Sequence, residues 1–302
     1  MSINELKSMS PRKLDEAYWK CGNITQLAVV YASDRGTVRK VLHQNKAGPY
    51  SPDLLERFQI SQDRIAPILT NKLELRGNWI ISADWHIPTH SMEWIGRLLN
   101  TAKSMLIKRL IIGGDLIDFA ALSYYYLKEN GDQRAPKVDM DYECTEGVLD
   151  VLETWFNEIV WILGNHEWRF MRMHRWGAKP TKLLSILNRL CDQRYRISGL
   201  SYCYVDDIRV THPKSFRNNK LSMANSLAAK YRCPVIQAHG HFLSLGFSTG
   251  GYRIADSGCL CDPDRTQYIA QADTSHNRWN NGFVIYKDGE LAIVGDGVGL
   301  IR

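Results

Sequence analysis

The chain has 302 residues, of which 44% are hydrophobic and 23% are charged, a composition typical of a globular protein with one large domain or two smaller ones. Its net charge is +6, and residues 1–72 hold 11 Lys and Arg against 7 Asp and Glu, so most of the basic excess lies in under a quarter of the chain. No apolar run approaches the roughly 18 residues of a membrane-spanning helix. The polar N-terminus lacks the apolar core of a signal peptide, so we predict a cytoplasmic protein without a membrane partner.

The seven cysteines contain no CxxC pair, which argues against a zinc knuckle and against a thioredoxin-type site. Their odd number agrees with a reducing compartment. Cys259 and Cys261 form a CxC motif, which we interpret as two ordinary packing thiols.

Residues 1–47 are predicted to be helical and are followed by a linker, Asn45–Asp53, which contains Gly, Pro and Ser. The pattern of apolar and polar residues changes near residue 78. We therefore predict a small all-α module with its linker at residues 1–72 and a second domain at residues 73–302.

Within the first module, the spacing of Ala28, Val38 and Val41 matches a helix-turn-helix, in which a small residue lets two helices cross and later apolar residues fix the second. Asp34–Leu42 would be the recognition helix, and Ala32 occupies the turn position that is usually Gly. The residues that this helix would offer to DNA are Arg35, Thr37, Arg39 and Lys40. A helical packing or oligomerisation module is the alternative interpretation.

After residue 78, short apolar runs alternate with amphipathic stretches of helical length, which predicts an α/β layered fold. The runs cover residues 79–81, 110–112, 159–163 and 234–236. Each run is followed directly by Asp, His, Asn or Gly. In α/β sheets the loops beyond the carboxyl ends of the strands carry the chemistry, so these loops predict a functional site.

The polar residues at these strand ends form a series of short motifs. They are Asp84-x-His86, Asp115-x-x-Asp118 after Gly114, Gly164-Asn165-His166-Glu167, His212 after a strand-like segment, and His239-x-His241. Five of the nine histidines of the chain lie in this series, which a shared metal site explains better than packing. Imidazole with carboxylate and no thiolate suits borderline cations, so we expect Mn²⁺, with Fe²⁺ and Zn²⁺ as alternatives.

The series of motifs resembles that of the calcineurin-like metallophosphoesterases and covers roughly residues 76–300. The resemblance implies a sandwich of two mixed β-sheets flanked by helices, with two metal ions at one edge. It also implies the ligands: Asp84, His86 and His241 for the first ion, Asp115 as the bridge, and Asn165, His212 and His239 for the second ion. His212 is not part of a local motif. His174 is the alternative for this ligand position, but it lies among arginines on a predicted helix.

Two cations hold a bridging hydroxide for in-line attack on a phosphoryl group in such sites. His166 is then the expected general acid for the leaving oxygen, and Asp118 is expected to orient it. A capping or surface carboxylate is the alternative for Asp118.

Three features point to nucleic acid, with DNA favoured, as the substrate. The basic helix-turn-helix-like module is one, and Tyr124–Tyr126, which could stack on unpaired bases, is another. The third is a stripe of arginines suited to further phosphates of the substrate: Arg169, Arg172 and Arg175. Lys214 and Arg217 are weaker candidates of the same kind. A solvated basic face and a local aromatic core are the alternatives.

The sequence therefore predicts a metal-dependent phosphodiesterase or nuclease. A phosphoprotein phosphatase is the first alternative, although Phe119 stands where those enzymes keep a phosphate-binding arginine, and they lack the His239-x-His241 pair. A small-nucleotide phosphodiesterase stays open. A catalytically inactive DNA-binding regulator is disfavoured because every motif position is filled.

Overall fold

The structure is a computed structural model that describes residues 2–21, 24–47, 72–122, 135–173, 181–265, 279–296 and 298–301. The chain divides into two compact units, Met1–Leu69 and Thr70–Arg302. Among the described residues, no helix is long and apolar enough to cross a membrane.

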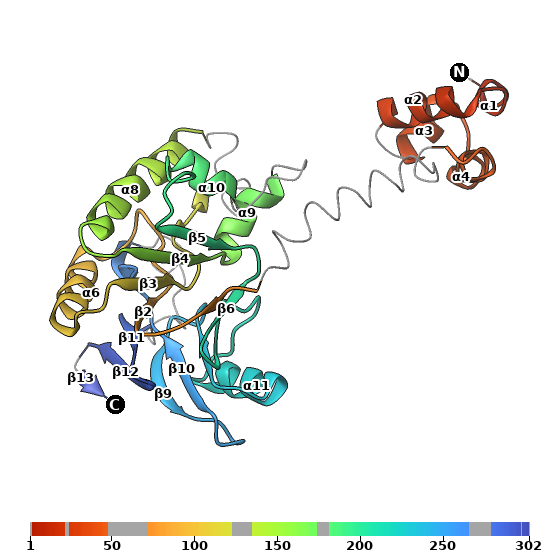
Figure 1. Cartoon of the computed structure of the whole chain (residues 1–302). Helices are drawn as coiled ribbons and strands as arrows, with labels where there is room; N and C mark the ends of the chain where they lie inside the picture. Colours follow the sequence, from red (N-terminus) through yellow and green to blue (C-terminus); the bar gives the residue numbers. More distant parts are fainter. Residues whose placement is uncertain are drawn as a thin grey trace. The chain divides into compact units, whose positions relative to one another are not determined.

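The first unit contains four described helices (Figure 1): α1 (Ile3–Lys7), α2 (Pro11–Cys21), α3 (Ile24–Val30) and α4 (Arg35–Gln44). Apolar residues from all four helices form one buried cluster, with Leu6, Leu14, Leu27 and Leu42 fully buried. The oxygens of Ser2 and Asp34 cap α1 and α4 by accepting hydrogen bonds from backbone N–H groups.

The helices α3 and α4 are joined by a tight turn. Ala32 adopts a left-handed conformation (φ +45°) in this turn, the backbone geometry that Gly adopts most readily. Ala28, Val38 and Val41 are buried in the shared cluster of this unit. The spacing argument therefore located two packed helices, and their binding to DNA stays a prediction.

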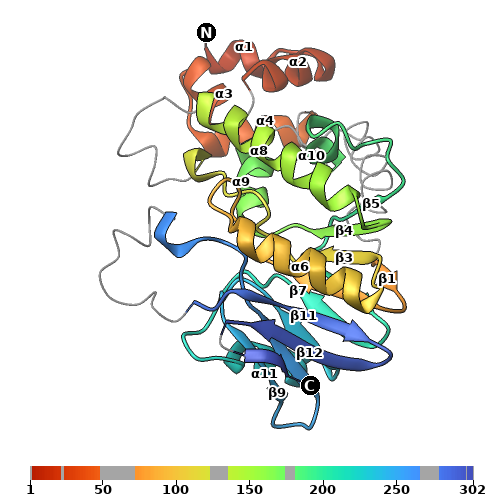
Figure 2. The ribbon, with the colours of Figure 1, turned by 90° about the vertical axis from the view of Figure 1, so that its left-hand side faces the viewer.

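The second unit contains a seven-stranded mixed sheet in the order β13-β12-β11-β2-β3-β4-β5. Its strands are β2 (Trp79–Ser82), β3 (Arg109–Ile112), β4 (Glu158–Ile162), β5 (Tyr195–Ser198), β11 (Gly282–Lys287), β12 (Glu290–Gly295) and β13 (Val298–Ile301). The strands β2 to β5 are parallel neighbours, and β11 to β13 add an antiparallel extension next to β2. Figure 2 shows β11 and β12 of this extension in dark blue, next to the C-terminus.

The other sheet has six strands in the order β1-β6-β7-β8-β10-β9. They are β1 (Glu74–Leu75), β6 (Tyr202–Val205), β7 (Ile208–Thr211), β8 (Val235–Gln237), β9 (Leu243–Phe247) and β10 (Arg253–Ser257). The pairs β7–β8 and β8–β10 are parallel, whereas β6–β7 and β9–β10 are antiparallel.

Helices connect and cover the sheets. They are α6 (Met92–Met105), α8 (Ala135–Glu153), α9 (Asn165–Met173), α10 (Thr181–Ile186) and α11 (Ser222–Tyr231), with short 3₁₀ helices at Ala120–Leu122 and Pro263–Arg265. α6, α8, α9 and α10 pack on one face of the seven-stranded sheet, and α11 packs on β8 and β10 of the other sheet (Figure 1).

The strand residues explain this layering because successive side chains of a strand point to opposite faces. In β4, Ile159 and Trp161 belong to the core under the helices, whereas Val160 and Ile162 belong to the core between the two sheets. A strand that is buried on both faces needs apolar residues at successive positions, and the apolar run at residues 159–163 agrees with this requirement. The predicted sandwich of two mixed sheets flanked by helices is confirmed.

Candidate metal centre

Five loops bring the predicted ligands to one place. The loops after β2, β3 and β4 leave the seven-stranded sheet at the same edge because these strands are parallel, and the loops after β7 and β8 do so in the other sheet. Backbone hydrogen bonds join the first two loops, from Asp84 N–H to Gly114 O (3.0 Å) and from His86 N–H to Asp115 O (3.1 Å). The fold thus unites motifs that are up to 157 residues apart, as counted from Asp84 to His241.

Asp84, His86 and His241 form the first group of potential ligands. All three side chains are buried, and their ligand atoms lie within 4.8 Å of one another. The Nε2 atom of His241 lies 3.2 Å from Asp84 Oδ1 and 3.3 Å from His86 Nε2. These are the residues that the resemblance assigns to the first ion.

The second group contains Asp115, His212 and His239, together with Asp84, again within 4.8 Å of one another. His212 Nε2 lies 3.3 Å from Asp115 Oδ2 and 3.1 Å from Asn165 Oδ1. The structure therefore brings His212 into the cluster, and all seven predicted ligands meet at this site.

The donor set fits two divalent cations. The Oδ1 atom of Asp84 is buried and lies 3.2 Å from His241 Nε2, so it faces another potential ligand atom, as the donor atoms of a shared cation do. His212 Nδ1 lies 2.9 Å from Gly113 O and donates its proton there, which turns Nε2 toward the cluster. A metal-binding histidine is usually held in this way.

Charges within the cluster shift several pKa values. Although burial lowers it, the charge and hydrogen bond of Asp115 raise the pKa of His212 to about 10. Burial and the charge of His212 lower the pKa of His239 to about 4. The clustered carboxylates thus hold a proton on His212 when no cation is bound.

The backbone of the site is strained. Five of the seven predicted ligands have a positive φ between +50° and +76°, a region that non-glycine residues seldom occupy. These residues are Asp84, His86, Asp115, His239 and His241. Each such residue costs about 1–3 kcal/mol, and conformations of this kind concentrate at functional sites.

Two glycines allow the loops to approach each other. A Cβ atom at Gly164 would overlap the carboxylate of Asp115, and one at Gly114 would overlap the ring of His212. Gly114 also has a φ of +100°, which strains any other residue.

His166 lies beside the ligands and contacts Asp118. Its Nδ1 atom is 3.0 Å from Asp118 Oδ1 and 2.5 Å from the backbone O of the same residue, so its N–H donates to Asp118. Its Nε2 atom lies 3.7 Å from Asp115 Oδ2 and faces the cluster. Asp118 Oδ1 also lies 3.0 Å from His86 Nδ1. One carboxylate therefore orients both the expected general acid and a predicted ligand.

Asp118 stays ionised in this position. Burial would raise its pKa, but hydrogen bonds from His166 and His86 outweigh burial and hold the pKa well below its usual range. Asp118 is 5% exposed and is therefore not a surface carboxylate, and its contacts with His86 and His166 agree with the orienting role.

Glu167 ends the Gly164-Asn165-His166-Glu167 motif, and the sequence predicts no role for it. Its buried side chain accepts hydrogen bonds from the backbone N–H groups of Asp115 (3.1 Å), Ile117 (3.1 Å) and Gly164 (2.8 Å). Burial and the nearby charge of Asp115 raise the pKa of Glu167 to about 7. Glu167 thus ties the β3 loop to the β4 loop. Glu167 lies in the first turn of α9, where a glutamate often accepts hydrogen bonds from backbone N–H groups, and this position is the sequence feature that could have indicated its role.

The predicted substrate residues differ in their surroundings. Arg169 is half-buried, and its Nη1 atom lies 3.1 Å from His166 Nδ1 and 3.5 Å from the carbonyl oxygen of Asp118. Because His166 Nδ1 donates to Asp118, Arg169 donates to the carbonyl. Arg172 is exposed on α9, whereas Arg175, His174 and Tyr124–Tyr126 lie outside the described residues.

In the first unit, Arg35, Arg39 and Lys40 are exposed on α4. Thr37 is engaged locally, since its hydroxyl donates to Asp34 Oδ2 (2.5 Å) and its N–H donates to Asp34 Oδ1 (2.9 Å). Three of the four predicted DNA contacts are therefore accessible.

Phe119 is fully buried and stacks on Phe170, with ring centroids 5.6 Å apart. The position after Asp118 therefore belongs to the core and offers no group to a phosphate. This geometry agrees with the departure from phosphoprotein phosphatases noted in the sequence.

No protein-family model and no curated protein sequence matches the chain. Among solved structures, it is similar to an archaeal phosphodiesterase, with 14% identity, a TM-score of 0.40 and coverage of 72% of this chain and 99% of that one. It is also similar to Vps29 from Chaetomium thermophilum, with 9% identity, a TM-score of 0.40 and coverage of 72% and 90%. A dimetal phosphatase from Danio rerio shows 8% identity, a TM-score of 0.38 and coverage of 74% and 98%.

Proposed function

We propose that this chain is a two-metal phosphoester hydrolase of the calcineurin-like superfamily. The observation that carries this proposal is the buried cluster in which seven imidazole, carboxylate and amide ligands meet beside His166. Two bound cations, with Mn²⁺ favoured, would polarise the phosphoryl group and activate water. Imidazole and carboxylate donors suit such ions.

The residues of the chain have separate tasks in this proposal. His166 presents Nε2 to the cluster while Asp118 holds Nδ1, which is the arrangement of an oriented proton donor for a leaving oxygen. Glu167 and the two glycines fix the loops that carry Asp115 and Asn165. In phosphoryl transfer, most of the rate acceleration comes from positioning the reactants and from stabilising charge. Rigid loops around the site should therefore favour a high rate.

We further propose a nucleic-acid phosphodiester as the substrate. The segment 214–220, directly after His212, is exposed and holds Lys214, Arg217 and Lys220 without an acidic residue. Phe216 in this segment is 54% exposed, and its ring centroid lies 5.5 Å from that of His239. Basic residues interleaved with an exposed aromatic ring match the needs of a charged backbone and an unpaired base.

Substrate preference tests this proposal. Mn²⁺-loaded protein is assayed on bis-p-nitrophenyl phosphate, p-nitrophenyl phosphate, single-stranded and double-stranded DNA, and a phosphopeptide. We expect cleavage of the diester and of DNA. A preference for the monoester and phosphopeptide without DNA cleavage would favour a phosphoprotein phosphatase, and cleavage of the small diester without DNA cleavage would favour a small-nucleotide phosphodiesterase. No activity on any substrate at full metal loading would leave the inactive DNA-binding regulator.

The variant Phe216→Ala refines the same test. Loss of stacking on one base, about 1–3 kcal/mol, predicts a raised KM for single-stranded DNA of roughly tenfold and an unchanged KM for the small diester. Phe247→Ala is the control because Phe247 is 71% exposed on β9. Equal effects of Phe216→Ala on both substrates would contradict a role in base stacking.

A further inference from the structure

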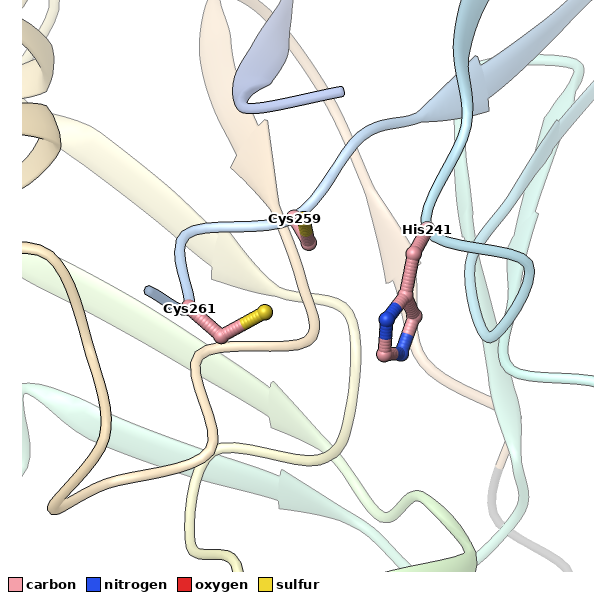
Figure 3. A group of neighbouring side chains, drawn as sticks. All are labelled: His241, Cys259 and Cys261. Carbon is pink, nitrogen blue, oxygen red and sulfur yellow. The ribbon is translucent and has the colours of Figure 1, made fainter. Parts of the chain in front are cut away.

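A second set of soft ligand atoms lies next to His241. The thiols of Cys259 and Cys261 and a ring nitrogen of His241 all lie within 4.8 Å of one another. Both cysteines are fully buried, and His241 is 6% exposed. Figure 3 shows the sulfur of Cys261 and the ring of His241 pointing toward one another.

The two ring nitrogens of His241 have different surroundings. Nε2 faces Asp84 Oδ1 and His86 Nε2, as described above, and thus belongs to the metal centre. Nδ1 is buried and, within the described part of the chain, has no hydrogen-bond partner. A metal-binding histidine normally gives its other nitrogen to a carboxylate, a carbonyl or water. The cysteine thiols are the ligand-type groups next to this nitrogen.

The local backbone holds both thiols in place. Cys259 and Cys261 are alternate residues of the segment that follows β10, so their side chains can project to the same side. The side-chain amide of Asn281 donates to the carbonyl of Cys261 (2.7 Å) and to that of Cys259 (3.3 Å). Isolated bridges pair Cys259 with Asn281 and Cys261 with His90. The two thiols are thus preorganised before any ion binds.

We propose that Cys259 Sγ, Cys261 Sγ and His241 Nδ1 form a separate site for one thiophilic divalent cation, of which Zn²⁺ is the type. Two thiolates and an imidazole are a soft donor set that suits such an ion. Each thiol releases its proton when it binds, and where the metal centre holds Nε2 the imidazole also gives up its Nδ1 proton and becomes a bridging imidazolate, so the cation replaces three protons. His241 then contacts this cation through Nδ1 and the metal centre through Nε2.

Cobalt spectroscopy tests the site because thiolate ligands give Co²⁺ an intense near-ultraviolet charge-transfer band. Co²⁺ alone is titrated into the metal-free full-length protein. We expect this band in the parent and its loss in Cys259→Ala/Cys261→Ala, with cobalt uptake lower by about one ion per chain. Cys203→Ala is the matched control, since Cys203 is also fully buried but lies in β6. This control should keep the band.

A persistent band in the double variant would overturn the proposal, as would a parent that binds cobalt without the band. If the double variant does not fold, X-ray absorption of the zinc-loaded parent decides. Sulfur neighbours of the zinc at about 2.3 Å support the site, and their absence refutes it.

This proposal rests on the proposed function in one respect, which is that His241 Nε2 belongs to the metal centre. Diester hydrolysis that is absent while the thiolate band is present would refute the proposed function and leave this site standing.

Discussion

At the scale of single residues, different side chains of the metal centre are assigned to cation binding and to proton transfer. Asp118 is central to this division because its carboxylate contacts His86 on one side and His166 on the other. His166 lies close enough to Asp115 and His86 to be counted with them as a potential ligand. Its contact with Asp118 through Nδ1 and the 3.7 Å between Nε2 and Asp115 Oδ2 favour an acid role over coordination.

His166→Ala tests that role. Removal of a general acid lowers kcat by about 10²–10⁴-fold, whereas the metal content should stay at the parent level. Turnover of the small diester and metal analysis by mass spectrometry measure the two quantities. Loss of the metal together with activity would make His166 a ligand instead.

The pH dependence of metal binding follows from His212. Its pKa is raised from 6.5 to about 10 in the metal-free protein, so the imidazole keeps its proton at neutral pH and above. A cation at Nε2 must displace that proton. The apparent metal affinity should therefore rise with pH below about 10, up to tenfold per pH unit for one proton.

Isothermal titration calorimetry in buffers of different ionisation enthalpy measures the released protons. We expect about one proton fewer for His212→Gln than for the parent at neutral pH, because the variant has no imidazole to deprotonate. Equal proton release by the two proteins would show that His212 is neutral before the cation binds.

At the scale of elements, the site depends on how closely the loops after β3 and β4 approach. Gly164 ends the β4 loop, and the first N–H groups of α9 follow it. The N–H of His166 donates to Asp115 Oδ1 over 2.9 Å, so the start of α9 helps to hold the carboxylate. Glu167 closes the same junction from inside, through three backbone N–H groups.

Gly164→Ala should therefore damage the site. Its Cβ would overlap the carboxylate of Asp115, which has to shift, so we expect metal affinity and turnover to fall by more than about tenfold. Gly147→Ala on α8 is the control, because nothing lies within 4 Å of its Cβ and alanine favours a helix by about 1 kcal/mol. Thermal unfolding and metal titration compare the two. Unchanged metal affinity in Gly164→Ala would show that the loops are less tightly coupled.

At the scale of the whole molecule, the question is whether the first unit contributes to substrate binding. Its helix α4 presents Arg35, Arg39 and Lys40 to solvent. If these residues contact phosphates, their replacement by Ala weakens DNA binding and lowers the salt slope by about 0.9 for each lost contact. Hydrolysis of the small diester should not change. Lys7, Lys13 and Lys20, replaced together, are the control with the same charge, since all three are exposed in the first unit.

DNA affinity measured over a range of salt concentrations separates the two variants. Equal losses in both would indicate general electrostatic attraction, and no loss in the α4 variant would favour the packing or oligomerisation module.

The sequence by itself determined the α/β layering and the candidate residues of the site, and the resemblance of its motifs implied the sandwich of two sheets. Strands buried on both faces need continuous apolar runs, and each run ended at a polar motif, so Asp84, Asp115, Asn165 and His239 could be located without coordinates. Only the tertiary structure decided how these motifs combine. It placed the isolated His212 in the cluster, gave Glu167 its three backbone contacts and turned His241 toward two buried thiols. Neither the left-handed backbone conformations of five predicted ligands nor these contacts could be predicted from the sequence. They arise between loops that are distant in sequence and meet only when the two sheets pack together.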